Sequence, residues 1–222
     1  MRCRGRRSRH AIPTKGGPAV KAIRMLFALL GATILLGALV GAASARNFSV
    51  SNQSLRGTFS SVEIEGGAWG IVRCRITVEG SFHSRTAAKV LGTLMGYITR
   101  VALGPCATGT ATALTETLPW HVKYSGFQGG LPQINSIIAH IIGSSWRVRE
   151  AGGINCLGRS TASEPSIAIF HRSTATHEIT EAGISGRIRT GSECFGIAGT
   201  FHSDSGSVTL LGSTTRITLS LI

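Results

Sequence analysis

The sequence lacks the short motifs by which several enzyme classes are recognised. It contains no C-x-x-C pair, the motif that supplies the dithiol of many redox enzymes and closely spaced ligands of many zinc sites. It contains no G-x-S-x-G elbow, and no two histidines are spaced as H-x-H or H-x-x-x-H. The sequence therefore predicts no catalytic residue, no metal ligand and no cofactor.

Aspartate is almost absent after the first 45 residues. Residues 46–222 contain one aspartate, Asp204, and nine glutamates. A Ser–His–Asp triad needs side chains that converge, whereas HSDS at 202–205 places them next to one another along the chain. We interpret that stretch as a polar turn. This favours a non-catalytic protein, and a hydrolase whose site is assembled from distant strands stays open as the alternative.

Acidic residues are also missing from the N-terminus, so the net charge of +13 is unevenly distributed. Residues 1–45 hold eight of the 23 Lys and Arg and none of the ten acidic residues, which leaves 15 basic residues against ten acidic ones beyond residue 45. A nucleic-acid interface requires basic residues clustered on one folded face. The remaining basic residues are scattered, and the sequence predicts no nucleic-acid partner.

The N-terminus has the organisation of a secretory signal peptide. A basic stretch ends at Arg24, the apolar run MLFALLGATILLGALV follows, and Ala43-Ser44-Ala45 matches the small-x-small cleavage rule. We predict a signal peptide over 1–45, cleavage before Arg46, and export by the general secretory route to the cell surface or the medium. Residues 1–19 are interpreted as an over-extended start.

An uncleaved anchor is the alternative reading of this leader. Met25 to Ala45 is 21 residues, which is long enough to span a bilayer. The positive-inside rule places 46–222 outside the cell in both cases. The chain would then meet the membrane only through its leader.

Cysteine usage agrees with export. Cys3 lies in the leader, and an even number remains: Cys74, Cys106, Cys156 and Cys194. Even counts in exported chains indicate disulfides. We predict two, Cys74–Cys106 and Cys156–Cys194, because these pairings close the shortest loops, and Cys74–Cys194 stays open as an alternative.

Apolar residues alternate with polar ones, which is typical of β-strands. In IVRCRITV at 71–78, Val72, Cys74, Ile76 and Val78 share one face, and the polar residues share the other. Glycine-rich turns are expected at 66–67, 129–130, 152–153 and 204–206. Further strands are expected at 107–114, 120–124, 133–143, 166–170, 185–190, 207–211 and 215–222.

The pattern predicts an all-β fold: a single antiparallel sandwich or barrel over 46–222, with at most one short helix, in 86–100, and two disulfides. An outer-membrane-type barrel is a third option. Its strands need lipid-facing bands of about ten residues, and the expected strands are shorter.

A short repeat occurs as GSFHS at 80–84 and GTFHS at 199–203, with a weaker copy, GTFSS, at 57–61. Paired His and Ser suggest catalysis, but the spacing also fits equivalent strands. If Phe82 and Phe201 point inward, then His83 and His202 point outward. We interpret the repeat as architecture.

The stretch LPWHVKYSGFQGGLP at 118–132 gathers three aromatic residues, Trp120, Tyr124 and Phe127. One interpretation is an aromatic ligand surface of the kind that stacks on carbohydrate. The other is a core strand that leads through a glycine-rich turn into 134–142.

Together, GTFSS, C-x5-GSFHSRTAAK, GYITR, LPWHVKYSGFQGGLP and the terminal TRITLSLI resemble a family of exported actinobacterial proteins of unknown function. The resemblance implies a secreted, disulfide-bearing envelope protein and implies nothing about mechanism. We expect an exported, disulfide-stabilised β-domain of the cell envelope or extracellular space. Its role is binding or structural, with a cell-envelope component or a carbohydrate as partner.

Overall fold

The fold is nearly all β. A computed structural model describes residues 47–66, 70–153, 155–188 and 199–222. Within these ranges the only helical element is a single 3-10 turn, η1 (Thr115–Thr117). The all-β expectation is confirmed.

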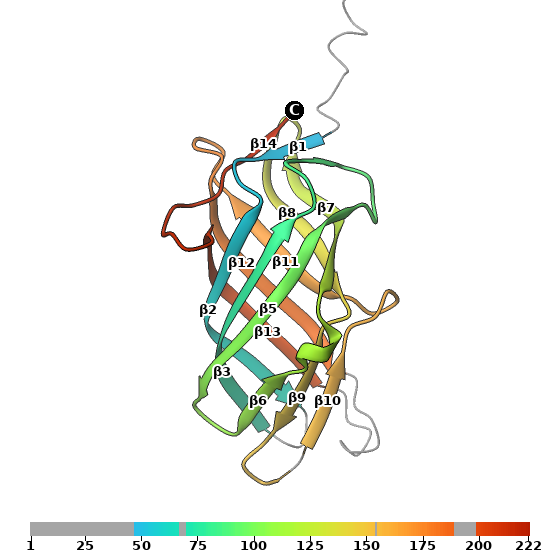
Figure 1. The fold of residues 1–222 in the computed structure, drawn as a ribbon, viewed down its shortest axis with the longest axis vertical. Helices are drawn as coiled ribbons and strands as arrows, with labels where there is room; N and C mark the ends of the chain where they lie inside the picture. The colour runs from blue at the N-terminus through green and yellow to red at the C-terminus, as the bar shows by residue number, and fades with distance from the viewer. Residues whose placement is uncertain (1–46, 67–69, 154, 189–198) are drawn as a thin grey trace, which may run out of the picture. The chain divides into compact units, whose positions relative to one another are not determined.

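Eight strands form a closed antiparallel barrel, which resolves the choice between sandwich and barrel (Figure 1). Around the barrel each strand pairs with the next barrel strand along the chain, and the last strand pairs with the first. The strands are β2 (Ser54–Gly66), β3 (Gly70–Phe82), β5 (Leu94–Cys106), β7 (Trp120–Gly130), β8 (Gln133–Ile142), β11 (Ser166–Arg172), β12 (Ile179–Ile188) and β13 (Gly199–Leu210).

Two three-stranded sheets lie at opposite ends of the barrel (Figure 1). One consists of β14 (Leu219–Leu221), β1 (Asn47–Val50) and β4 (Thr86–Ala88). The other consists of β10 (Asn155–Arg159), β9 (Ser145–Arg149) and β6 (Thr110–Ala113). Both contribute buried apolar side chains to the same core as the barrel, including Phe48 from β1 and Trp146 from β9. The barrel interior is therefore covered at both ends.

The barrel strands are longer than the sequence pattern indicated. β2, β3 and β5 have 13 residues each. The expected turn at 204–206 was wrong, because these residues lie inside β13. Gly206 does not mark a turn there but leaves room for the Phe59 ring of the neighbouring strand β2.

Two other segments were less certain from the sequence. The segment 86–100, where a short helix or a strand fitted the pattern, comprises β4, a turn and the first half of β5. The glycines at 92 and 96 oppose a helix, and Gly92 adopts a φ of +80° in the turn. The strand expected at 215–222 is present only as β14, because Arg216 and Thr218 make isolated bridges and belong to no strand.

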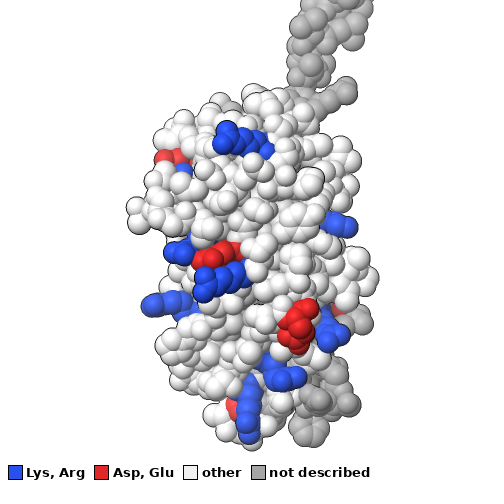
Figure 2. Space-filling model, viewed as in Figure 1, with Lys and Arg blue, Asp and Glu red and all other residues white. Residues whose placement is uncertain are grey.

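Alternation along β3 is confirmed, with Val72, Cys74 and Ile76 buried and Arg73 and Arg75 exposed between them. Outward-facing side chains form ion pairs across strands. These are Arg56–Glu79 at 2.7 Å, Arg73–Glu63 at 2.6 Å and Arg100–Glu79 at 3.5 Å. On the face shown in Figure 2, acidic and basic side chains lie in small mixed groups rather than gathered by sign.

The hydrogen bond that Glu63 accepts from Arg73 holds the pKa of the Glu63 carboxyl below its ordinary value. This effect outweighs desolvation, which acts in the opposite direction. The Arg73–Glu63 ion pair thus favours the ionised form of this carboxyl.

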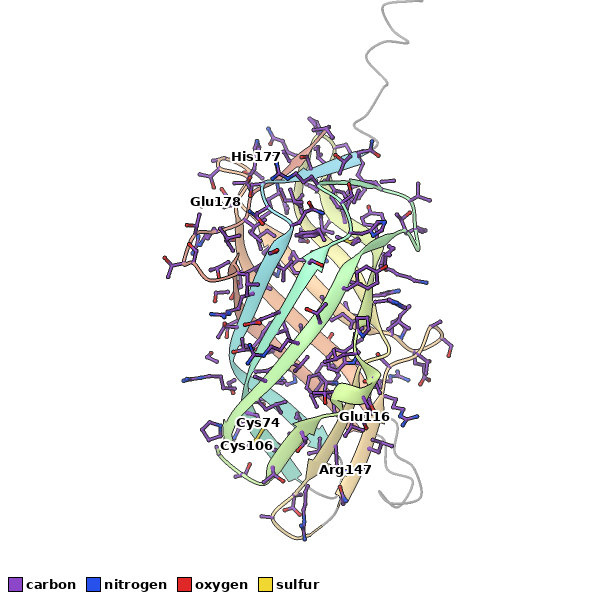
Figure 3. The ribbon with its side chains drawn as sticks, viewed as in Figure 1. Cys74, Cys106, Glu116, Arg147, His177 and Glu178 are labelled. Carbon is purple, nitrogen blue, oxygen red and sulfur yellow. A yellow bond between two sulfur atoms is a disulfide. The ribbon has the colours of Figure 1, made fainter. Side chains whose placement is uncertain are left out.

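The disulfide between Cys74 and Cys106 is confirmed. The two residues pair directly across β3 and β5, with their Cα atoms 4.1 Å apart (Figure 3). Cys156 is buried in β10. Its predicted partner, Cys194, lies outside the described residues, so that pairing stays a prediction.

The end of the barrel beneath β1 and β14 contains a buried arginine. Arg172 Nε donates to the Leu219 carbonyl at 2.6 Å, and Nη1 donates to the Ile134 carbonyl at 2.9 Å. Nη2 bonds to Nδ1 of His177. Burial lowers the pKa of Arg172 from its ordinary value. The side chain therefore ties β14, β8 and the β11–β12 connection together at this end.

The predicted signal peptide, residues 1–45, lies outside the described residues. Within the described ranges, no helix has the length and apolar character needed to cross a membrane.

Candidate functional site: a cavity inside the barrel

The three copies of the repeat place their phenylalanine rings inside the barrel. Phe59, Phe82 and Phe201 are all buried, whereas His83 and His202 are exposed. The rings come from β2, β3 and β13, which are neighbours in the barrel. The expected inward position of the phenylalanines and outward position of the histidines are therefore confirmed, and all three rings line one cavity.

The cavity has a volume of about 80 Å³, counted as space open to the centre of a water molecule. All eight barrel strands contribute to its wall, and Ser144 and Trp146 close it from the β9 side. No lysine, arginine, histidine, aspartate or glutamate is among the lining residues. Its wall is almost wholly apolar, so it suits a small apolar molecule.

Two glycines leave the space that the rings of Phe201 and Phe59 occupy. A Cβ at Gly186 would lie 2.5 Å from Cε1 of Phe201, and one at Gly206 would lie 2.5 Å from Cδ1 of Phe59. Real Cβ contacts are never this short, so a side chain at either position would displace a ring. The glycines of β12 and β13 thus determine where the rings lie.

A cluster of serines forms a polar spot at the β9 end of the cavity. Ser144 Oγ donates to Ser160 Oγ at 2.7 Å and lies 3.2 Å from Ser166 Oγ. The Ser144 backbone N–H also donates to Ser160 Oγ. All three serines are buried, and two of them, Ser144 and Ser166, line the cavity. Their hydroxyls bond to one another.

Two tryptophans lie beside the serines. The Trp120 and Trp146 rings meet edge to face, with centroids 4.9 Å apart, and Trp146 also lies against Phe201 at 6.3 Å. Trp120 Nε1 donates to Thr117 Oγ1 of η1 at 2.8 Å. Trp146 Nε1 is buried, and no atom of the described residues accepts a hydrogen bond from it. The two indoles therefore differ in whether their N–H is paired.

The predicted aromatic ligand surface does not form, because Trp120 and Tyr124 are buried at 1% and 4% exposure. Trp120 lines the cavity, and Tyr124 packs against Phe48 with ring centroids 5.8 Å apart. Phe127 is half-buried beneath the Lys89 ammonium, 5.9 Å from its ring centroid. Of the three aromatic residues, only Trp120 lines the cavity.

One contact resembles a nucleophile and its base. Ser125 Oγ lies 2.8 Å from His140 Nε2 across β7 and β8. A hydrolytic triad needs a third group that orients the histidine. In the described part of the chain, no carboxylate bonds to His140. Neither residue lines the barrel cavity.

Metal-ligating side chains are scattered over the described residues. No group of three or more His, Cys, Asp or Glu among them could hold a metal ion. His83 and His121 flank Tyr97 on the outer face of the barrel, at ring distances of 6.2 and 5.5 Å.

Sequence reasoning missed the residues at the β9 end of the cavity. Trp146 lies in β9, Ser166 lies in β11, and Ser144 immediately precedes β9. None of the three carries a motif. The alternation in SSWRVR at 144–149, with Trp146 and Val148 buried, was the one available signal. It predicts a buried tryptophan but not its place at a cavity.

Comparison with known proteins adds no relative: no protein-family model, curated protein or solved structure matches this chain.

Proposed function

We propose that the protein is an exported, non-catalytic binding domain whose barrel holds a small apolar ligand. The observation that carries this proposal is the cavity inside the barrel, whose wall comes from all eight strands and has no charged side chain. Eight-stranded barrels are just wide enough either to fill with side chains or to hold one small ligand. Here three phenylalanines narrow the interior without filling it.

Two features support export. The N-terminal sequence has the basic, apolar and small-residue regions of a signal peptide. The Cys74–Cys106 disulfide suits an oxidising compartment, since cytosolic thiols are kept reduced. On this proposal the domain works at the cell envelope or in the medium, where a shielded interior can carry a molecule that water dissolves poorly.

Ligand binding is tested by methyl NMR with 2-methylbut-1-ene, an apolar probe of five non-hydrogen atoms. Saturable shifts are expected for methyl groups of Ile76, Val78 and Val208, which line the cavity. The methyl groups of Val90, which is 62% exposed, should stay unchanged. Ala168→Leu places a larger side chain in the cavity wall and should abolish the shifts. Shifts at Val90 alone, or none at all, would exclude the cavity as a binding site.

Export is tested separately by N-terminal sequencing of the protein that cells release. The expected N-terminus is Arg46. A full-length protein confined to the cytoplasm would refute the export half of the proposal and leave the cavity result intact.

The second candidate function is a secreted hydrolase, and the Ser125–His140 contact is the observation that favours it. A fluorophosphonate that labels Ser125, with labelling lost in His140→Ala, would establish this function. We favour the binding role because neither Ser125 nor His140 lines the barrel cavity.

A further inference from the structure

We propose that the turn between β4 and β5, residues 89–93, docks onto a lipid bilayer that has anionic headgroups. None of these residues lines the cavity, so the inference goes beyond the proposed function and does not depend on it. In Figure 1 the turn lies at the β1 end of the barrel, directly before β5. Ala88, the last residue before the turn, pairs with Asn47 of β1.

The turn carries an apolar tip, which consists of Val90 and Leu91. At 62% and 74% exposure, these are the most exposed large apolar side chains of the described residues. They are also adjacent in the chain, whereas the exposed apolar residues of soluble proteins are normally scattered singly. Transfer of both side chains from water into an apolar environment would be favourable.

Backbone hydrogen bonds hold this tip in place. The Thr93 N–H donates to the Val90 carbonyl at 3.0 Å and closes a four-residue turn, in which Gly92 has a φ of +80°. The Gly92 N–H donates to the Tyr124 carbonyl, and the Tyr124 N–H donates to the Thr93 carbonyl, both at 2.8 Å. Such a turn requires a residue like glycine at Gly92 but no apolar residue at Leu91. The backbone of the tip is therefore already ordered, which lowers the entropic cost of docking.

Two lysines lie next to the turn. Lys89 directly precedes the tip, and Lys123 pairs with Leu94 at the start of β5. Within the ranges that the structure describes, no carboxylate forms an ion pair with either lysine. The Lys89 ammonium lies 5.9 Å from the Phe127 ring centroid. The sequence from 80 to 115 contains no acidic residue, so the charge beside the tip is positive.

An apolar tip beside positive charge fits the surface of an anionic bilayer. Apolar side chains gain free energy at the boundary between headgroups and acyl chains, and basic side chains are attracted to anionic headgroups. A stable protein interface uses about 20–30 residues from each partner and requires matching shapes. A bilayer has no fixed shape to match, so a tip of two apolar side chains is enough to enter it.

The test uses Leu91→Trp, which places a fluorescent side chain at the tip, and phosphatidylglycerol vesicles with bromine on their acyl chains. Bromine quenches tryptophans that enter the acyl region, so the readout reports on the tip whether or not the leader is retained. The wild-type protein gives the background of the native tryptophans. Ile71→Trp is the matched control, because Ile71 is an exposed apolar residue whose carbonyl accepts from Thr108, beside β6 at the opposite end.

We expect quenching above background for Leu91→Trp and none for Ile71→Trp. Adding Lys89→Gln to Leu91→Trp should raise the lipid concentration for half-maximal quenching about fivefold, the contribution of one basic residue at an anionic surface. Adding Arg147→Gln instead should leave that concentration unchanged, because Arg147 lies on β9 at the opposite end of the barrel (Figure 3). Thermal melts establish that the variants fold, and Val90→Trp replaces Leu91→Trp as the reporter if the latter unfolds.

The other outcomes overturn the proposal. A tip reporter quenched no more than the wild-type protein would show that the turn does not enter the bilayer. Equal quenching of Leu91→Trp and Ile71→Trp would show that this end has no preference for lipid. An unchanged midpoint with Lys89→Gln would remove the role of the anionic headgroup. If the tip instead joins two copies of the chain, light scattering will show a dimer that Val90→Ser converts to a monomer, without quenching by lipid.

Discussion

The ring of Phe59 occupies the space in which a side chain at Gly206 would lie, with Cδ1 2.5 Å from an ideal Cβ. The two residues pair directly across β2 and β13. The contact explains why a glycine lies in the middle of β13, although a glycine inside a strand lowers stability because it has no side chain to pack. It also links the weak repeat copy GTFSS to the wall of the cavity.

Gly206→Ala should therefore destabilise the protein by about 1–3 kcal/mol, the usual cost of overpacking a filled interior. Gly130→Ala is the control, since a Cβ there meets nothing within 4 Å. Urea unfolding measures both. Adding Phe59→Leu should recover part of the Gly206→Ala loss, and equal stability of the two glycine variants would show that the ring does not need this space.

The repeated phenylalanines and histidines should respond oppositely to substitution. Phe82→Ala and Phe201→Ala each remove a buried ring and should cost about 3–5 kcal/mol. His83→Ala and His202→Ala change exposed residues and should stay within about 0.5 kcal/mol. Thermal melts of the four single variants give the comparison. Histidine variants that melt earlier than the phenylalanine variants would contradict the architectural interpretation.

Removing the disulfide should lower the free energy of unfolding, because the unfolded chain gains conformational entropy without the cross-link. Cys74 and Cys106 are 32 residues apart, and a loop of that size corresponds to about 4 kcal/mol in the chain-entropy model. The double variant Cys74→Ala, Cys106→Ala should lose that much in the free energy of unfolding, measured by urea titration.

Peptide mapping without reduction tests the second pairing. It should yield a Cys156–Cys194 peptide besides the Cys74–Cys106 one. A peptide that joins Cys74 to Cys194 would contradict both assignments.

Tyr124 should make the fold sensitive to alkaline pH. Burial raises its pKa above the ordinary value near 10, because the phenolate is desolvated. The folded-state pKa is thus higher than the unfolded one. The stabilisation is fully present below pH 10 and is lost as the pH rises through that value towards the folded pKa.

The measurement uses a Tyr97→Phe background, which leaves Tyr124 as the only tyrosine. Absorbance of the phenolate should rise together with loss of the circular dichroism of the sheet. Tyr124→Phe should shift alkaline unfolding to higher pH. A phenolate that forms while the sheet stays intact would show that Tyr124 is accessible to water.

The local alternation of residues was enough to predict much of this molecule. Val72, Cys74 and Ile76 lie inside the barrel because strand side chains alternate between two faces and apolar ones leave water. The same alternation places Phe82 inside and His83 outside. Because neighbouring strands are close in sequence, the Cys74–Cys106 bridge was also predictable.

Strand ends and turns were less predictable, as β13 shows. Glycine with Ser and Asp at 204–206 has the composition of a turn, yet the strand continues through it. Its neighbour β2 places the Phe59 ring against Gly206, so a contact between residues distant in sequence overrides the local signal.

Antiparallel β-structure with an apolar inner face in residues 47–222 could be predicted from the sequence, since side-chain alternation is a local property. Closure of the sheet could not be predicted, because it depends on the pairing of β13 with β2. Only the tertiary structure decided that Trp146 meets Trp120 at a cavity. These residues come from different sheets, and their meeting depends on how the sheets pack.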